Sequence, residues 1–258
     1  MRTTAIMNLK GGTGKTVTAI NTAAILAQDY GRRVLLVDAD SQENLTEFVS
    51  SAQTSDRIHL GGIADLLRGQ GAAALATRMK NVKILPADET LMALDVSSTG
   101  TGKADPMALE EYLDKKATSF EHCIIDCPPA FSAAAMAALI AADEVVIPMK
   151  VDAFGIRGMA NLLEQIRNMR RVNEDLEIAG VLPTMVYPDP RLRDKEAELR
   201  QSLAAAGIRC FHHILWSKLV DEMTFEQRPL IEDHKKSRAL REYRIFVRDL
   251  LGGEDDGV

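Results

Sequence analysis

The chain has 258 residues, of which 46% are hydrophobic, so it is long enough to bury a large core in a single α/β domain. Its net charge of -6 excludes a protein that is basic throughout and coats nucleic acid with its whole surface, while a local basic face stays compatible with this charge. No apolar stretch is long enough to cross a bilayer, and a strand is predicted almost at once, so we expect neither a membrane span nor a signal peptide.

Short apolar runs alternate with segments of helix length along the whole chain. Seven of these runs are predicted to be strands: 4–8, 34–38, 82–86, 122–126, 144–149, 178–183 and 210–215. Such alternation predicts an α/β fold, a doubly wound and mainly parallel sheet with helices on both faces, in which ligands bind where the strands end. We predict one domain over 1–251 and a disordered acidic tail at 252–258.

A glycine-rich turn follows the first predicted strand and precedes a predicted helix over 17–28. A strand, a glycine turn and a helix start form a phosphate cradle, because glycine lets backbone N–H groups approach phosphates and a helix N-terminus attracts anions. Within it, Lys15 is expected to reach the β- and γ-phosphates and the Thr16 hydroxyl to ligate Mg²⁺. A second lysine, Lys10, precedes the glycines, which marks a deviant form of the nucleotide loop. The predicted nucleotide-binding residues are Gly11, Gly12, Thr13, Gly14, Lys15, Thr16 and Val17.

Carboxylates follow two other predicted strands. Asp38 and Asp40 end the strand at 34–38; we expect Asp38 to hold a water on Mg²⁺ and Asp40 to orient or deprotonate the attacking water. A cap on the following helix is the alternative role for one of them. Asp126 ends the strand at 122–126 and is predicted to reach the outer shell of the metal, ahead of two prolines that impose an extended exit.

The three motifs together resemble the ParA/Soj branch of the deviant P-loop ATPases, whose relatives include MinD and the nitrogenase iron protein. The first follows the family pattern Lys-Gly-Gly-Val-Gly-Lys-Thr with Thr13 in place of Val. The second, Asp38-Ala39-Asp40-Ser41-Gln42-Glu43-Asn44, follows Asp-Leu-Asp-Pro-Gln-Gly-Asn, with Ser41 and Glu43 replacing the family's Pro and Gly. The third, Ile-Ile-Asp-Cys-Pro-Pro at 124–129, matches without change.

This resemblance implies a slow, Mg²⁺-dependent and partner-stimulated hydrolysis of ATP to ADP in an ATP-dependent homodimer. Lys10 of each subunit would reach the partner's phosphates, Lys15 and Thr16 would bind phosphate and Mg²⁺ in their own subunit, and Asp40 would support hydrolysis. The ATP dimer would bind DNA nonspecifically, and a ParB-like centromere-binding protein would release it. The resemblance thus implies a cytoplasmic protein that associates with the nucleoid in its ATP state.

The late part of the chain departs from the family pattern. In the segment 214–223, the proline that helps to frame adenine and the expected arginines are missing, so DNA contact by this segment is an open question. Trp216 lies there, and core packing is preferred for it over an adenine-side contact. Arg241, Arg244 and Arg248 are spaced to share one helix face, although a solvated face is the alternative for any single arginine. The candidate DNA-binding residues are Arg191, Arg193, Lys218, Arg228, Arg241 and Arg244.

Other members of the superfamily suggest rival functions. A MinD-like membrane ATPase is disfavoured because the amphipathic segment 240–251 ends in an acidic tail that anionic lipid would repel. An iron-protein-like reductase is disfavoured because Cys127 lacks a second well-placed cysteine; Cys123, Cys127 and Cys210 are interpreted as small buried hydrophobes in a reducing cytosol. A tyrosine kinase would need a tyrosine-rich tail. A nucleotide-gated scaffold that positions a protein cargo stays open.

Overall fold

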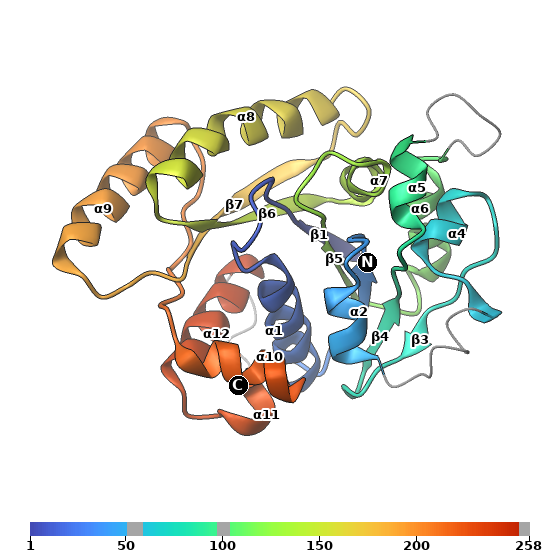
Figure 1. Cartoon of the computed structure of the whole chain (residues 1–258), viewed down its shortest axis with the longest axis horizontal. Helices are drawn as coiled ribbons and strands as arrows, with labels where there is room; N and C mark the ends of the chain where they lie inside the picture. Colours follow the sequence, from blue (N-terminus) through green and yellow to red (C-terminus); the bar gives the residue numbers. More distant parts are fainter. Residues whose placement is uncertain (51–58, 97–103, 253–258) are drawn as a thin grey trace.

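The computed structural model describes residues 1–50, 59–96 and 104–252. Seven strands form one sheet in the order β3-β4-β2-β5-β1-β6-β7, and every pairing is parallel except that of β3 with β4. The predicted α/β fold with a mainly parallel sheet is therefore confirmed (Figure 1). The strands are β1 Arg2–Ile6, β2 Val34–Asp38, β3 Leu75–Ala76, β4 Val82–Leu85, β5 His122–Asp126, β6 Glu144–Lys150 and β7 Glu177–Thr184.

Helices cover both faces of this sheet. Alternate residues of a strand point to opposite faces, and Ala5 and Ile6 accordingly belong to two separate buried clusters. One cluster includes residues of α1, α11 and α12, and the other includes residues of α4, α6 and α7. The helices are α1 Lys15–Gln28, α2 Asn44–Val49, α4 Ile63–Leu67, α5 Leu91–Val96, α6 Ala108–Lys116, α7 Ala133–Ala141, α8 Ala153–Met169, α9 Pro190–Ala205, α10 Lys218–Glu226, α11 Leu230–Asp233 and α12 Arg238–Leu250.

The observed sheet differs from the predicted one in two features. The segment 210–215 is not a strand; it forms isolated bridges of Cys210 to Val181 in β7 and of Leu215 to Val186 beyond the end of β7. The short antiparallel strand β3 was not predicted, because two residues are too few to show a pattern. Residues 253–258 of the acidic tail lie outside the described residues, so the disorder of the tail and the domain limit at 251 stay predictions.

The strand order brings the three sequence motifs to one edge of the sheet. β1 lies between β5 and β6, and β2 lies on the far side of β5. In this register Ile6 is beside Asp126, and Asp126 is beside Asp38. Since these strands are parallel, the loop that follows β1 and both aspartates meet at their carboxyl ends.

Among the described residues, no helix combines the length and the apolar character needed to cross a membrane.

Candidate nucleotide site

The loop between β1 and α1 carries the lysine–glycine motif. Gly12 and Gly14 adopt φ values of 69° and 83°, a left-handed conformation that residues with a Cβ rarely adopt. Gly14 directly precedes α1 and has no side chain to cap the amide groups of the first helical turn. Thr184 Oγ1 donates a hydrogen bond of 2.8 Å to the carbonyl of Thr13, which ties the loop to the end of β7. The loop therefore combines backbone N–H groups with a helix N-terminus, as phosphate binding requires.

A cleft of about 510 Å³ opens beside this loop. Its volume lies within the range of roughly 300–1,000 Å³ that is typical of small-molecule sites. Asp40, Phe48 of α2, Met185 after β7 and Thr224 of α10 contribute to its walls. The structure also places every predicted nucleotide-binding residue on this cleft, namely Gly11, Gly12, Thr13, Gly14, Lys15, Thr16 and Val17.

Lys15 begins α1 and is 8% exposed. Its Nζ donates a hydrogen bond of 3.4 Å to the carbonyl oxygen of Lys10. Burial lowers the pKa of Lys15, and the negative charges of Asp126 and Asp40 offset this effect only in part. A buried ammonium group that is incompletely compensated is well suited to a polyanionic ligand such as a triphosphate.

Asp38 and Asp126 are neighbours in register at the ends of β2 and β5, and their exposures are 0% and 1%. Burial raises the pKa of Asp38 to about 7, although the backbone and hydroxyl of Thr46 both donate hydrogen bonds to its Oδ2. Burial and the nearby Asp38 raise the pKa of Asp126 well above its ordinary value, against the opposing effects of Thr16 and Lys15. A bound cation would relieve the crowding of these two carboxylates.

Asp126 also offers a test of whether a metal ion fits this site. Its Oδ1 is buried and has no hydrogen-bond partner among the described residues, which is costly for a carboxylate oxygen unless a ligand or water completes its contacts. The oxygens of Asp126, Asp38 and the Thr16 hydroxyl are hard donors of the kind that Mg²⁺ prefers. The residues present therefore fit the predicted Mg²⁺.

Asp40 lies on the wall of the cleft. Its Oδ1 accepts a hydrogen bond of 3.1 Å from the backbone of Gln42, so the turn that follows holds the carboxylate. Glu43 then adopts a φ of 56° at the N-cap of α2. The family pattern has glycine at this position, and the left-handed backbone gives the physical reason for that glycine.

Three residues near the site were not predicted from the sequence. Thr46 orients Asp38 through the two hydrogen bonds described above, and its Oγ1 also accepts one of 3.0 Å from the backbone of Ala87. Thr184 anchors the phosphate loop. Asp152 binds Lys10: the Nζ of Lys10 lies 2.7 Å and 3.0 Å from the two carboxylate oxygens. Among the residues of the motif, Lys10 is the one that the described walls of the cleft do not include.

The candidate DNA-binding residues are spread over several elements, and most of those with described side chains form ion pairs. Lys218 pairs with Glu222 at 2.9 Å, and Arg228 pairs with Asp233 at 3.0 Å. Arg244 of α12 donates two hydrogen bonds to Asp29 at the end of α1. By contrast, the Arg241 side chain is exposed. Arg191 and Arg193 lie in α9, where their side chains are outside the described part of the structure.

Trp216 is not a core residue, so the preferred expectation for it is wrong. It is 46% exposed and stacks on Tyr187, with ring centroids 5.6 Å apart and an interplanar angle of 14°. It also lines a cavity of about 60 Å³ together with Gly14 and Val17. Cys123 and Cys127 are buried as expected, whereas Cys210 is only partly buried, and burial raises the pKa of all three thiols.

Comparisons with known proteins of similar sequence and structure point to the same family as the three sequence motifs. A family model described as an AAA domain matches residues 1–178. The chromosome partitioning protein ParA of Caulobacter vibrioides is 30% identical over 262 residues, which cover 99% of this chain and 96% of that protein. The structure of an ATP-bound variant of Cyanothece McdA has a TM-score of 0.81 at 26% identity and covers 98% of this chain and 96% of its own.

A further solved structure contains both a nucleotide and a metal. It is that of a cobyrinic acid a,c-diamide synthase from Mycobacterium smegmatis with a bound ATP analogue and magnesium, and its TM-score is 0.77 at 28% identity. The match covers 100% of this chain and 97% of that one. The family model and relatives aligned over most of the chain confirm the resemblance that the three motifs indicate. This chain therefore belongs to the ParA/Soj family of P-loop ATPases.

Proposed function

We propose that this chain is a Mg²⁺-dependent ATPase that dimerises with ATP, binds DNA nonspecifically in that state, and partitions plasmid or chromosomal DNA with a ParB-like centromere-binding partner. The observation that carries the proposal is the different placement of the two motif lysines. Lys15 lines the cleft, whereas Lys10 pairs with Asp152 and is not among the described residues that line it. A lysine of the phosphate loop that does not line its own cleft fits the role of contacting nucleotide in a partner subunit.

Each group of residues in the cleft has a separate role in hydrolysis. The loop amides and Lys15 bind the phosphates, and they hold the γ-phosphate in place for in-line attack. Asp40 orients the attacking water and accepts its proton. Thr16, Asp38 and Asp126 would hold Mg²⁺, which when bound neutralises charge on the β- and γ-phosphates. Lys10 of the partner subunit would add positive charge at the γ-phosphate, so each cleft would be complete only in the dimer.

Dimerisation couples the nucleotide to DNA binding in this proposal. Two subunits joined through their nucleotides present twice the basic surface, and linked weak contacts bind DNA more tightly than either does alone. Phosphate contacts of this kind carry no sequence preference and weaken steeply with salt. The protein would then lie on the nucleoid in its ATP state and return to the cytoplasm after a ParB-like partner stimulates hydrolysis. The exposed Arg241 is the best-placed contact among the candidates with described side chains.

The decisive experiment measures binding to random-sequence duplex DNA with ATP, ADP or no nucleotide, at two salt concentrations. The wild type is compared with Asp40→Ala, which should hold ATP longer, and with Lys15→Ala as a control that should lose nucleotide and DNA binding together. Binding that requires ATP, lasts longer in Asp40→Ala and disappears at high salt supports the proposal.

A second candidate function is a nucleotide-gated scaffold that positions a protein cargo. The ion pairs of Lys218, Arg228 and Arg244 favour it, since these cations are already engaged within the subunit. An ATP-dependent dimer that binds DNA in no nucleotide state would overturn the DNA role and leave the scaffold.

A further inference from the structure

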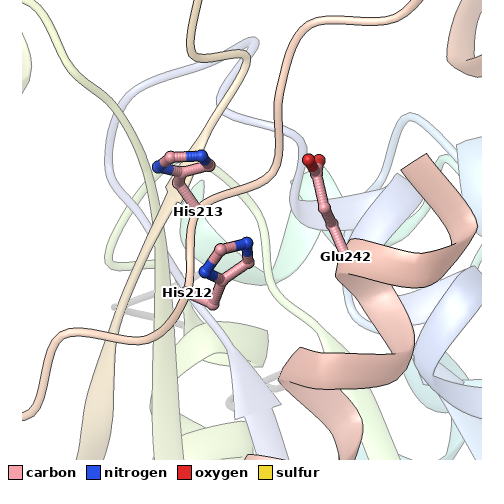
Figure 2. Close-up of side chains that lie close together, drawn as sticks. All are labelled: His212, His213 and Glu242. Carbon is pink, nitrogen blue, oxygen red and sulfur yellow. The ribbon is translucent and has the colours of Figure 1, made fainter. Parts of the chain in front are cut away.

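We propose that His212, His213 and Glu242 bind a Zn²⁺ ion, at a site separate from the nucleotide cleft. One ligand atom from each residue lies within 4.8 Å of the others (Figure 2). The two histidines come from the segment 210–215, and Glu242 comes from the facing surface of α12. Two imidazoles and a carboxylate form a donor set that suits Zn²⁺ and leaves a fourth position for water.

An irregular backbone brings the two histidines together. Phe211 and Ile214, three residues apart, donate successive hydrogen bonds to the carbonyls of Val181 and Pro183, which are only two residues apart on β7. One extra residue therefore lies locally between Phe211 and Ile214, as in a β-bulge, and the bridges of Cys210 to Val181 and of Leu215 to Val186 show the same register on either side of it. Neighbouring side chains of a regular strand point to opposite faces, but the rings of His212 and His213 have centroids only 4.8 Å apart. Bulges of this kind re-aim side chains next to functional sites.

His213 is held in the tautomer that a metal ligand needs. Its Nδ1 lies 2.9 Å and 3.1 Å from the two carboxylate oxygens of Glu196 in α9. A carboxylate only accepts hydrogen bonds, so Nδ1 carries the proton, and in the neutral ring the lone pair is on Nε2. A carboxylate on the far nitrogen is the usual second partner of a histidine bound to zinc.

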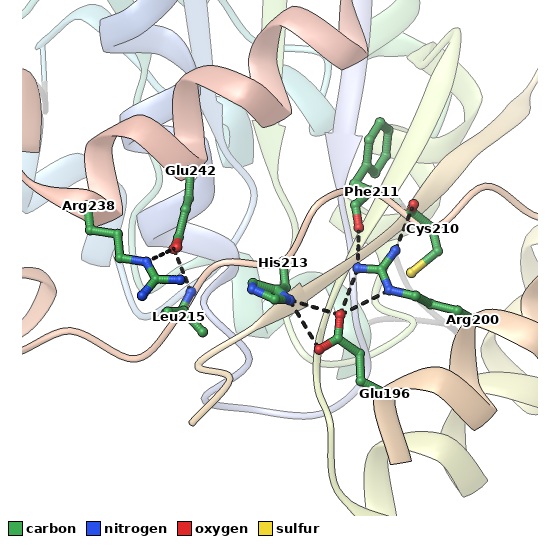
Figure 3. Close-up of polar contacts among 8 residues, drawn as sticks. All are labelled: Glu196, Arg200, Cys210, Phe211, His213, Leu215, Arg238 and Glu242. Carbon is green, nitrogen blue, oxygen red and sulfur yellow. Dashed lines mark hydrogen bonds and ion pairs between the residues drawn. The ribbon is translucent and has the colours of Figure 1, made fainter. Parts of the chain in front are cut away.

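Glu196 is itself held in place by Arg200. Arg200 donates to its Oε1 from Nε and Nη2 at 3.0 Å and 2.7 Å, and also reaches the carbonyl of Phe211 (Figure 3). The partner of His213 is thus a preorganised carboxylate.

The remaining ligands are near enough to approach a zinc ion by side-chain rotations. The ring of His212 lies beside that of His213, with an interplanar angle of 31°. The Glu242 carboxylate is buried and accepts hydrogen bonds from the backbone of Leu215 and from Arg238. The Arg238 side chain is 65% exposed, so it can move into solvent when a cation takes over its charge. Donors around one zinc ion lie about 3.3 Å apart, so ring rotations must draw the three atoms closer.

The test uses tag-free, full-length protein stripped of metal, without nucleotide, and titrates Zn²⁺ in competition with a chromophoric chelator. We expect one Zn²⁺ per chain, and His212→Ala and His213→Ala should each weaken binding at least tenfold. His59→Ala removes an exposed histidine elsewhere, and Cys210→Ser removes the nearest thiol; neither should change the affinity. Thermal unfolding without metal verifies that the variants fold.

Two further measurements sharpen the result. Glu196→Gln keeps all three ligands but replaces the partner of His213, so it should weaken binding by about 10- to 100-fold. Bound Co²⁺ should show a visible absorption band in the wild type that disappears in His213→Ala. The proposal is overturned if the wild type shows no saturable binding, or if both histidine variants bind Zn²⁺ as tightly as the wild type. None of these readouts depends on ATP hydrolysis.

Discussion

The Nζ of Lys10 lies 2.7 Å from Oδ2 of Asp152, a residue that follows β6. The lysine and the carboxylate are 37% and 31% exposed, so solvent screens their attraction, and such a pair contributes at most about 1 kcal/mol. Within one subunit this contact directs Lys10 toward Asp152. If Lys10 serves a partner subunit, the contact with Asp152 competes with dimerisation.

Asp152→Ala should therefore promote dimerisation. We expect the ATP concentration for half-maximal dimer formation to fall by up to about fivefold, which corresponds to the loss of roughly 1 kcal/mol. Light scattering coupled to size exclusion at several ATP concentrations measures the shift. Loss of the dimer in this variant would instead show that Asp152 acts across the dimer interface.

Lys10→Ala should separate nucleotide binding from assembly. Lys10 is not among the described residues that line the cleft, so the variant should bind a fluorescent ATP analogue with nearly wild-type affinity and stay monomeric. Lys15→Ala is the matched control and should lose the nucleotide itself. An ATP-dependent dimer of Lys10→Ala would refute the role assigned to Lys10.

The phosphate loop could be predicted because its geometry is local. Lys15 and Thr16 begin a helix directly after a glycine turn, so all residues of the loop are adjacent in the sequence. Asp38 and Asp126 each end a continuous apolar run of the kind that forms a buried strand in a parallel sheet. Asp152 could not be predicted, because it is 142 residues from Lys10 and only the neighbouring positions of β1 and β6 bring the two together.

The structure of the segment 210–215, by contrast, could not be predicted from its sequence. Its apolar character predicted a seventh strand, yet the extra residue between Phe211 and Ile214 interrupts regular pairing with β7. Whether a strand pairs regularly depends on the register of its partner, which composition does not encode. The same irregularity creates the histidine pair, so the residues of the proposed zinc site could not be grouped from sequence alone.

His122 at the start of β5 should make stability depend on pH. Burial, followed by the positive charges of Arg32 and Arg2, lowers its pKa in the folded protein. The unfolded chain therefore binds this proton more readily, so the contribution of His122 to the free energy of unfolding is largest above pH ~6.5 and decreases as pH falls below that value. Urea unfolding in the presence of a chelator measures the slope of the free energy of unfolding against pH, which should be less positive in His122→Leu than in the wild type and stay unchanged in His59→Ala. Equal slopes in the wild type and His122→Leu would contradict this prediction.

Glu43 should be a point of stored backbone strain. Its φ of 56° is left-handed, which costs a residue with a Cβ about 1–2 kcal/mol and costs glycine almost nothing. Glu43→Gly should then be about 1 kcal/mol more stable than Glu43→Ala, because both remove the side chain but only glycine relieves the strain. Chemical denaturation of the two variants makes the comparison, and equal stability would show that the loop relaxes around alanine.

Arg241 and Arg244 provide a paired test of the DNA face, since both lie on α12 and only Arg244 is tied to Asp29. Arg241→Ala should weaken binding to random DNA and reduce the slope of log affinity against log salt by about 1, as expected when one phosphate contact is lost. Arg244→Ala should change that slope less and lower the melting temperature instead, because it removes a contact between α12 and α1. Binding measured at several salt concentrations with ATP, together with thermal unfolding, separates the two effects. If Arg244→Ala lowered the salt slope as much as Arg241→Ala, the Asp29 pair would have to open on DNA, and α12 would contact the duplex through both arginines.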